Sequence, residues 1–473
     1  MADEQTSRSP LELDGESMRR LGYQVIDRLV ERAGAMREGP AWQPGDRTEL
    51  GQLVGGPPDE LPGDAAALVD HLLTAIVPHG QRPDHPRFLG YVPGAATWPA
   101  VMGDLLATGC NIFAGSWIGS SGATAVELEV LAWFCSWLGY PASAEGILTS
   151  GGSEANLLGV LCARNAVLAD DATGGVVYLS SETHSSVDRA LRAAGFAADA
   201  IRHLPVDRAR ALDVPALAAA ISADRAAGRH PALVIASAGT TGTGAIDPLA
   251  AVAAVCRRDG VWLHVDAAYG GCFALTSRGR DALRGLGEAD SITLDPHKGL
   301  AQPWGTGCLL VQRPGLLASA FHLMPAYLRD SAVHGDEVNM YDRGLQLTRP
   351  ARALKIWLSV HALGLSAFRA SLDNALDLAQ VAEATIREHS EAEIVAPASL
   401  GIVCFRRSDG RNDEAVRALN ATGVGHVSST ALDGEVVLRI CANNFTTTEA
   451  DVAIVLDRLL GPLPARRFPA HRR

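Results

Sequence analysis

The stretch "VWLHVDAAYGG", residues 261–271, decides the fold class. It begins with a continuous, mostly apolar run, which is followed by an aspartate and then by small residues. A strand covered on both faces of a parallel sheet reads as such a run, whereas a half-exposed strand alternates apolar and polar residues. Similar runs are "GVVYLSS", "ALVIASA", "SITLDP" and "GCLLVQ", and helical stretches at 214–227 and 250–259 separate several of them. This rhythm predicts an α/β domain with a mostly parallel central sheet.

Different patterns flank this predicted domain on both sides. Residues 14–36 and the later stretch "DAAALVDHLLTAIV" place apolar side chains at helical spacing, which predicts a helical N-terminal arm over residues 1–84. The large domain is expected at 85–365, and a helical stretch over about 351–389 leads out of it. "GIVCFRR" and "EVVLRICAN" then resemble antiparallel strands and precede a final helix, so we expect a small α+β domain at 366–473.

Composition narrows the class of protein. The net charge of −12 argues against a nucleic-acid partner, because no basic stripe offsets the acidity. No apolar run is long enough to cross a membrane, and the polar, acidic N-terminus does not resemble a signal peptide. The eight cysteines are scattered without a CxxC pair, which favours reduced thiols in a cytoplasmic protein and no metal site.

Lys298, in the stretch "LDPHKGL", is unusual because this chain carries nearly every positive charge on arginine. Only two of its 41 lysine and arginine residues are lysines, Lys298 and Lys355. Arginine stays protonated, whereas a lysine shielded from water can lose its proton and attack a carbonyl group. Lys298 is therefore a candidate for a Schiff base with a carbonyl cofactor, and the alternative is an ordinary surface lysine.

A phosphate cradle is the best interpretation of "LTSGGSEANLLGVLCARN", residues 148–165. Gly151 and Gly152 permit a close approach of the backbone, Ser153 offers a hydroxyl group, and an apolar-periodic helix begins directly behind them. Backbone N–H groups and the dipole at the start of that helix favour a dianionic ligand. The same sequence also suits a simple helix cap.

Polar side chains follow other predicted strands. Asp266 ends a strand that we expect to be buried, so its carboxylate needs a partner: a turn, an arginine, or the pyridine nitrogen of pyridoxal phosphate (PLP). Ala268 lies on the same side of the strand and leaves room for a flat ring. His184 is placed either to stack on that ring or to serve as an ordinary core histidine. Strand ends are where open α/β sheets bind ligands.

The order of these motifs resembles a known family. Gly-Gly-Ser-Glu-Ala, His-Ser-Ser, Gly-Thr-Thr, His-Val-Asp-Ala-Ala-Tyr and Asp-Pro-His-Lys follow one another as in the group II PLP-dependent amino-acid decarboxylases, the relatives of aromatic-L-amino-acid decarboxylase. The resemblance extends from about His85 to Trp357, well over half the chain. It implies the type I, aspartate aminotransferase-like fold of PLP-dependent transferases and a homodimer whose active sites are shared between the subunits.

The resemblance also implies residue roles. Lys298 is the Schiff-base lysine, Asp266 pairs with the ring nitrogen, and His184 stacks on the ring opposite Ala268. Tyr327 matches the loop tyrosine that protonates the substrate α-carbon after carbon dioxide leaves. The remaining cofactor positions lie near the phosphate, the ring or the lysine: Gly151, Gly152, Ser153, Thr241, Asp295 and His297.

The substrate pocket departs from the aromatic decarboxylases. Gly115 stands where they place a large ring, and Gly299 stands where the family often has an aromatic residue. Arg349, or alternatively Arg352, is expected either to brace the site or to meet the substrate carboxylate. The other residues at pocket positions are Tyr91, Val92, Pro93 and Phe113.

The resemblance implies decarboxylation of an L-amino acid, with an aromatic or bulky apolar side chain favoured, to the amine and carbon dioxide. The alternatives are a PLP-dependent aldehyde synthase, another lyase that cleaves a Cα bond, and a PLP-binding protein without catalytic activity. The intact set of motifs and Tyr327 favour the decarboxylase.

Overall fold

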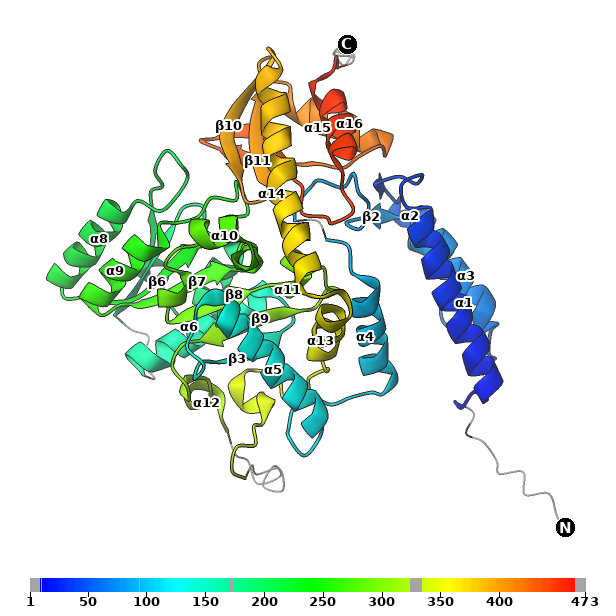
Figure 1. The fold of residues 1–473 in the computed structure, drawn as a ribbon, viewed down its shortest axis with the longest axis horizontal. Coiled ribbons are helices and arrows are strands. Elements are labelled where there is room, and N and C mark those ends of the chain that lie inside the picture. Colours follow the sequence, from blue (N-terminus) through cyan, green and yellow to red (C-terminus); the bar gives the residue numbers. More distant parts are fainter. Residues whose placement is uncertain (1–8, 10, 93, 170–173, 324–333, 464–473) are drawn as a thin grey trace.

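A computed structural model describes residues 9, 11–92, 94–169, 174–323 and 334–463 of the chain (Figure 1). Its described helices include none that is both long and apolar enough to cross a membrane.

The central sheet has seven strands in the order β3-β9-β8-β7-β6-β4-β5. Strand β9 runs antiparallel to β3 and β8, and the other neighbouring strands are parallel to each other. Strand β7 lies in the middle and is buried at every position, as its continuous apolar run predicts. The predicted, mostly parallel sheet is therefore confirmed. The strands are β3 (Glu145–Thr149), β4 (Gly175–Ser180), β5 (Ile201–Leu204), β6 (His230–Ser237), β7 (Trp262–Ala267), β8 (Ser291–Leu294) and β9 (Gly307–Val311).

Helices cover this sheet. Helix α6 (Gly152–Leu168) crosses its middle and contacts β6, β7, β8 and β9, while α8 (Val214–Ala226) and α9 (Leu249–Asp259) pack on each other beside β6 (Figure 1). The other helices around the sheet are α4 (Trp98–Gly109), α5 (Ser121–Leu138), α7 (Ser185–Ala193), α10 (Ser277–Ala282), α11 (Pro296–Gly299) and α12 (Leu316–Phe321).

The C-terminal part forms a second layer of structure. Its four strands are all antiparallel in the order β10-β11-β13-β12, and the long helix α14 packs on β10 and β11. The single helical stretch expected over 351–389 is two helices, because Gly364 adopts φ of 76° and ends the first one. The elements are α13 (Ala353–Leu363), α14 (Leu365–Glu388), β10 (Ala392–Ser399), β11 (Ile402–Arg407), α15 (Asn412–Thr422), β12 (Ser428–Leu432), β13 (Glu435–Cys441) and α16 (Glu449–Leu460).

The N-terminal arm stands away from the body of the chain (Figure 1). Helices α1 (Gly15–Gly34), α2 (Arg47–Val54) and α3 (Ala65–His71) contain no buried residue. Their apolar side chains therefore face solvent in a single chain, for example Met18, Tyr23, Val30, Val54 and Leu68. Two short strands, β1 (Trp42–Gln43) and β2 (Gly80–Gln81), pair at the base of the arm. The domain limits expected from the sequence stay a prediction.

Candidate active site

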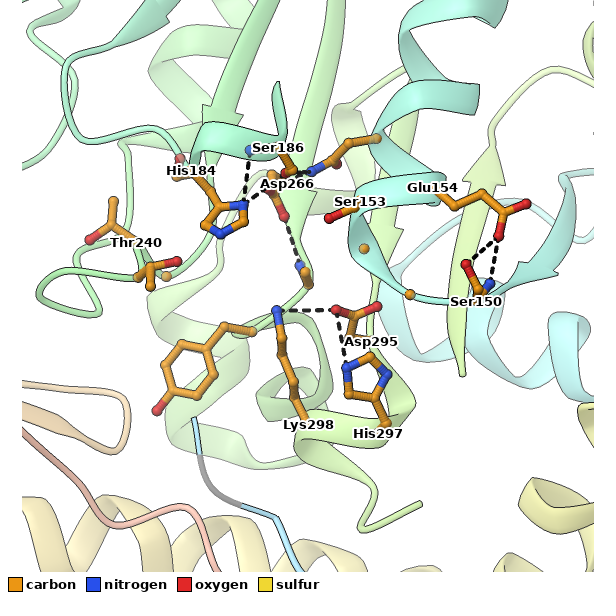
Figure 2. Close-up of a pocket in the computed structure, with 18 residues that line it drawn as sticks. Ser150, Ser153, Glu154, His184, Ser186, Thr240, Asp266, Asp295, His297 and Lys298 are labelled. Carbon is orange, nitrogen blue, oxygen red and sulfur yellow. Dashed lines mark hydrogen bonds and ion pairs between the residues drawn. The ribbon is translucent and has the colours of Figure 1, made fainter. Parts of the chain in front are cut away.

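A cavity of about 280 Å³ lies where strands β3, β4, β6, β7 and β8 end. All ten residues predicted to contact the cofactor line this one cavity, although they come from segments far apart in the sequence (Figure 2). They are Gly151, Gly152, Ser153, His184, Thr241, Asp266, Ala268, Asp295, His297 and Lys298.

Lys298 enters the cavity from the short helix α11, directly after strand β8. Its Nζ lies 3.1 Å from Asp295 Oδ2, and its side chain is 24% exposed (Figure 2). Asn443, from the C-terminal part of the chain, donates an amide hydrogen to the backbone carbonyl of Lys298 at 2.7 Å. The lysine is thus held from two sides and remains open to the cavity.

His297 fixes the floor of the cavity beside the lysine. Its Nδ1 donates to the carbonyl of Thr306 at 2.7 Å, and its Nε2 lies 3.8 Å from Asp295 Oδ2. Burial lowers the pKa of His297, which favours the neutral imidazole. Asp295 Oδ1 is buried and has no hydrogen-bond partner among the described residues, so this carboxylate has capacity for a further donor.

Asp266 presents its carboxylate from the end of β7. Oδ1 accepts a hydrogen bond from the backbone N–H of Ala268 at 3.1 Å, and Oδ2 accepts from Asn156 Nδ2 at 2.8 Å. The side chain of Ala268 lies near Gly152, where an added Cβ would approach the alanine methyl group to 3.0 Å. These small residues keep a flat space open in front of the carboxylate.

His184 caps helix α7 at another edge of the cavity. Its Nδ1 accepts from the backbone N–H of Ser186 at 3.2 Å and lies 2.8 Å from Ser186 Oγ (Figure 2). Burial lowers the pKa of His184, and the charge of Asp266 opposes that shift. The other ring nitrogen, Nε2, takes no part in these contacts.

The first turn of α6 forms the remaining wall. Gly151 has φ of 155°, which an L side chain rarely adopts, and a Cβ on Gly152 would lie 2.8 Å from Asp295 Oδ2. The free N–H groups at the start of this 17-residue helix, together with Ser153, therefore reach the cavity without steric obstruction. This geometry suits an anion such as a phosphate group.

A steric contact that the sequence did not reveal explains why residue 299 is a glycine. A Cβ at this position would lie 2.3 Å from Cβ and 2.8 Å from Sγ of Cys272. Cys272 itself is buried against the core. Any larger side chain after the lysine would therefore collide with this neighbour.

The predicted substrate-pocket residues do not all converge on Lys298 within one chain. Tyr91 and Val92 lie on the segment that reaches the lysine, since a Cβ on Gly94 would lie 3.2 Å from the His297 carbonyl. Phe113 instead lines a second cavity of about 670 Å³, which shares only Ser150 with the first. Pro93 and Tyr327 lie outside the described residues.

Gly115 and Arg349 have clear packing roles. A Cβ on Gly115 would lie 2.4 Å from Cζ of Phe113 and 2.6 Å from the Leu347 carbonyl, so glycine lets the phenyl ring pack there. Arg349 is 1% exposed and pairs with the fully buried Glu127 at 2.6 Å. It also donates to the carbonyls of Ala114 and Leu148, both at 2.8 Å. Of the two roles expected for Arg349, these contacts favour the bracing role, although the residue also lines the second cavity.

Sequence reasoning missed several residues that line the cavity. Asn156 is the most informative, because it lies one helical turn after Ser153 and its amide contacts Asp266. That spacing could have revealed it, since residues three apart share a helix face. The others are Ser150, Glu154, Ser186 and Tyr269. Ser237, Gly239 and Thr240 also line the cavity, from the turn at 237–242 that the sequence places at the end of the predicted strand "ALVIASA".

The residues present fit PLP. A lysine amine, a carboxylate in front of a flat space, an imidazole and a glycine-lined helix start supply one partner for each group of that cofactor. The fold and the site together define a PLP-dependent enzyme of the aminotransferase-like type.

Comparison with known proteins identifies the family. The model of the pyridoxal-dependent decarboxylase conserved domain matches residues 57–408. An aromatic-L-amino-acid decarboxylase of Bacillus atrophaeus is 38% identical over 94% of this chain and 95% of its own length. An L-2,4-diaminobutyrate decarboxylase of Rhizobium meliloti is 34% identical over 92% of this chain and 90% of its own length. The crystal structure of Oryza sativa TDC with PLP and tryptamine has a TM-score of 0.90 at 27% identity, covering 96% of this chain and 99% of that one.

The chain therefore belongs to the pyridoxal-dependent decarboxylase family. Its cofactor is PLP, and it is a carboxy-lyase that removes the carboxyl group of an amino acid.

Proposed function

We propose that this enzyme decarboxylates an L-amino acid with an aromatic or bulky apolar side chain, and that Lys298, Asp266 and His184 perform the work. The observation that carries the proposal is that these three side chains, from three different strand ends, line one cavity with the start of α6. When bound, PLP withdraws electrons from the breaking Cα–carboxylate bond.

Each residue has a defined task in this proposal. Lys298 would hold the cofactor covalently through its amine and yield it to the amino group of the substrate. Asp266 would pair with the ring nitrogen and stabilise its positive charge, and His184 would pack on the ring opposite Ala268. The helix start at Gly152 and Ser153 would bind the phosphate group.

Tyr327 is proposed as the proton donor to the α-carbon. A Tyr327→Phe variant should release less amine and more aldehyde, because an α-carbon left unprotonated can be oxidised by dissolved dioxygen, with release of ammonia and hydrogen peroxide. Product analysis by chromatography checks this. An unchanged rate and amine yield would exclude Tyr327 from that role.

We infer that the enzyme is a homodimer in which each subunit completes the other's site. Phe113 lines the second cavity rather than the one that contains Lys298, and helices α1 and α3 of the arm have no buried residue in one chain. Leu105 and Leu106 on α4 are each more than half exposed. Apolar surfaces of this kind are typical of subunit interfaces.

The dimer is tested by placing charges on that surface. A Leu105→Glu/Leu106→Glu variant should sediment as a monomer and lose turnover while it retains Lys298. A monomeric wild-type enzyme with full activity would contradict the shared site. A Val54→Glu variant, at an exposed position on the N-terminal arm, tests whether the arm also stabilises the dimer. We expect this change to weaken the dimer as well.

The assignment of an aromatic or apolar substrate side chain is supported by Val92 and Phe113, which the sequence resemblance places at pocket positions, and by the similarity to an aromatic-L-amino-acid decarboxylase. A panel of L-amino acids, including tryptophan, tyrosine, phenylalanine, leucine and 2,4-diaminobutyrate, with carbon dioxide and amine measured together, tests this. Preference for a charged side chain would overturn the aromatic or apolar assignment. Aldehyde as the main product would favour an aldehyde synthase.

We place the enzyme in the cytoplasm. All eight cysteines are free, and seven of them are buried. Unpaired thiols are typical of proteins in a reducing compartment. Fractionation of the source cells, with the enzyme detected by antibody, tests this location.

A further inference from the structure

A row of buried polar side chains continues behind the cavity, beyond the residues that touch it. Trp262 Nε1 donates to Ser291 Oγ at 3.0 Å, and Ser291 Oγ lies 2.8 Å from His264 Nδ1. His264 Nε2 then lies 3.1 Å from Asn156 Oδ1. The mechanism proposed above uses none of these four side chains.

The direction of each hydrogen bond follows from Asp266. Its carboxylate only accepts, so Asn156 must present its NH₂ group, and this group donates to Asp266 Oδ2 at 2.8 Å and to Ser186 Oγ at 3.1 Å. Both amide hydrogens are then used. Asn156 Oδ1 is left to accept, so His264 must carry a proton on Nε2.

His264 has only that one proton. The ring is fully buried, and burial lowers its pKa to about 4, which leaves the imidazole neutral near pH 7. Its Nδ1 therefore accepts the hydroxyl hydrogen of Ser291, whose oxygen accepts from Trp262. Thr293 Oγ1 lies 3.4 Å from Nε2 and is at most a weak second acceptor.

The same amide reaches the second functional side chain. Ser186 Oγ accepts from Asn156, so its own hydroxyl hydrogen goes to His184 Nδ1 at 2.8 Å, where the Ser186 backbone N–H also donates. His184 Nδ1 is thus an acceptor, and the proton of the neutral ring lies on Nε2. One asparagine orients both the carboxylate and the imidazole.

Close packing fixes this arrangement. Asn156 is 1% exposed on α6, and a Cβ on Gly159, one turn further along, would lie 2.6 Å from His264 Cε1. The glycine lets the helix approach the histidine closely enough for the Asn156 contact. A misdirected amide would place its oxygen against the Asp266 carboxylate, which is costly in a buried site.

We propose that Asn156 and His264 are positioning residues of the cofactor site, which hold the Asp266 carboxylate and the His184 tautomer in the orientation that receives PLP. This inference rests on the PLP site proposed above but not on the identity of the substrate. It assigns a function to buried groups that would otherwise serve only as core packing.

The test is PLP binding by the apoenzyme, measured as the dissociation constant from the rise of visible absorbance, together with the pH dependence of that band. Asn156→Leu should raise the dissociation constant by about 10- to 100-fold, because a hydrogen bond to a charged group is lost. Asn156→Leu should also shift the pH at which the visible absorbance band of bound PLP changes, relative to the wild type. Ser291→Ala, which removes only the far hydroxyl group, should raise the dissociation constant by a smaller factor.

Tyr178→Phe is the matched control. It also removes one buried hydrogen bond from the same sheet, between the Tyr178 hydroxyl and Asp224 Oδ2 at 3.0 Å, but it has no link to the cavity. It should leave the dissociation constant and the pH profile unchanged. The inference is overturned if Asn156→Leu and Ser291→Ala bind PLP as the wild type does. It is also overturned if Tyr178→Phe weakens binding as much as Ser291→Ala.

These measurements need no substrate, so they separate the inference from the proposed reaction. If the amino-acid panel gave no decarboxylation while Asn156→Leu weakened PLP binding, the inference would stand and the substrate assignment would fail.

Discussion

The Cβ that Gly299 lacks would lie only 2.3 Å from the Cβ of Cys272. Residue 299, which follows the cofactor lysine, is therefore glycine because the side chain of Cys272 already occupies the space that a Cβ would need. The Sγ of the cysteine would lie 2.8 Å away, whereas its Cα would lie at 3.7 Å, an ordinary contact distance.

This relationship predicts a specific rescue. Gly299→Ala should destabilise the protein by about 1–3 kcal/mol through overpacking and lower its PLP content. Adding Cys272→Gly should recover much of that loss because the colliding Cβ is gone, whereas adding Cys272→Ala should not because its Cβ remains. Urea unfolding of the single and double variants measures the coupling. Equal behaviour of the two double variants would contradict the steric explanation.

The scarcity of lysine permits an unambiguous test of cofactor attachment. Reduction of the holoenzyme with borohydride should fix the cofactor on Lys298, and peptide mass mapping should find the label there and not on Lys355. Lys355 is buried and pairs with Asp104 at 3.0 Å, away from the first cavity. A Lys298→Arg variant should show no label and no visible absorbance. Label on Lys355 in the wild type would sink the assignment.

The buried pair of Arg349 and Glu127 predicts a strong but partly reversible loss of stability. Arg349→Met leaves the buried carboxylate without its cation and should cost about 3–5 kcal/mol. Adding Glu127→Gln removes the uncompensated charge and keeps an acceptor for the Leu148 N–H, so the double variant should be more stable than Arg349→Met alone. Denaturant unfolding checks the order. If Arg349→Met kept full stability but raised KM, the residue would contact substrate instead.

His426 predicts a pH dependence of stability. The ring is 5% exposed and stacks on Phe88 at 4.6 Å, and neither ring nitrogen has a partner among the described residues. Burial lowers its pKa from 6.5 to about 4, so the unfolded chain binds a proton more readily than the folded one. Its contribution is complete above about pH 6.5 and is lost as the pH falls toward 4, by about 1.4 kcal/mol per pH unit.

A His426→Phe variant isolates this effect because it keeps the stacked ring and cannot be protonated. Between pH 7.5 and 5.5 the wild type should lose about 1.4 kcal/mol more unfolding free energy than the variant. Urea titrations at the two pH values measure the difference. Parallel losses in both proteins would show that His426 is not the group responsible.

The sequence predicted five strands of the large sheet, β4, β6, β7, β8 and β9, because they are buried on both faces and therefore read as continuous apolar runs. The sequence did not predict β3 or the partly exposed edge strand β5. It did not predict β10 or β12, whose positions are partly exposed and follow no clean pattern. The break at Gly364 was also missed, because a glycine within an apolar-periodic stretch does not by itself announce a left-handed φ.

The site shows the same division. Residues at or shortly after the ends of strands, such as Asp266 and Lys298, could be predicted because strand ends meet at one edge of a sheet. Asn156 could not be assigned a partner, because its contact with Asp266 depends on how closely α6 approaches β7. The position of Phe113 at a separate cavity follows from the tertiary fold and leaves no trace in the local sequence.

The hydrogen bond from Asn443 to the carbonyl of Lys298 ties the last third of the chain to the residue that carries the chemistry. The large sheet and its helices are consequently not expected to form a functional site without the C-terminal part of the chain. A gene fragment that ended before β13 would encode every strand-end residue of the cavity yet lack the anchor for its lysine. Insertions and fusions should be tolerated at the chain ends rather than between the two layers.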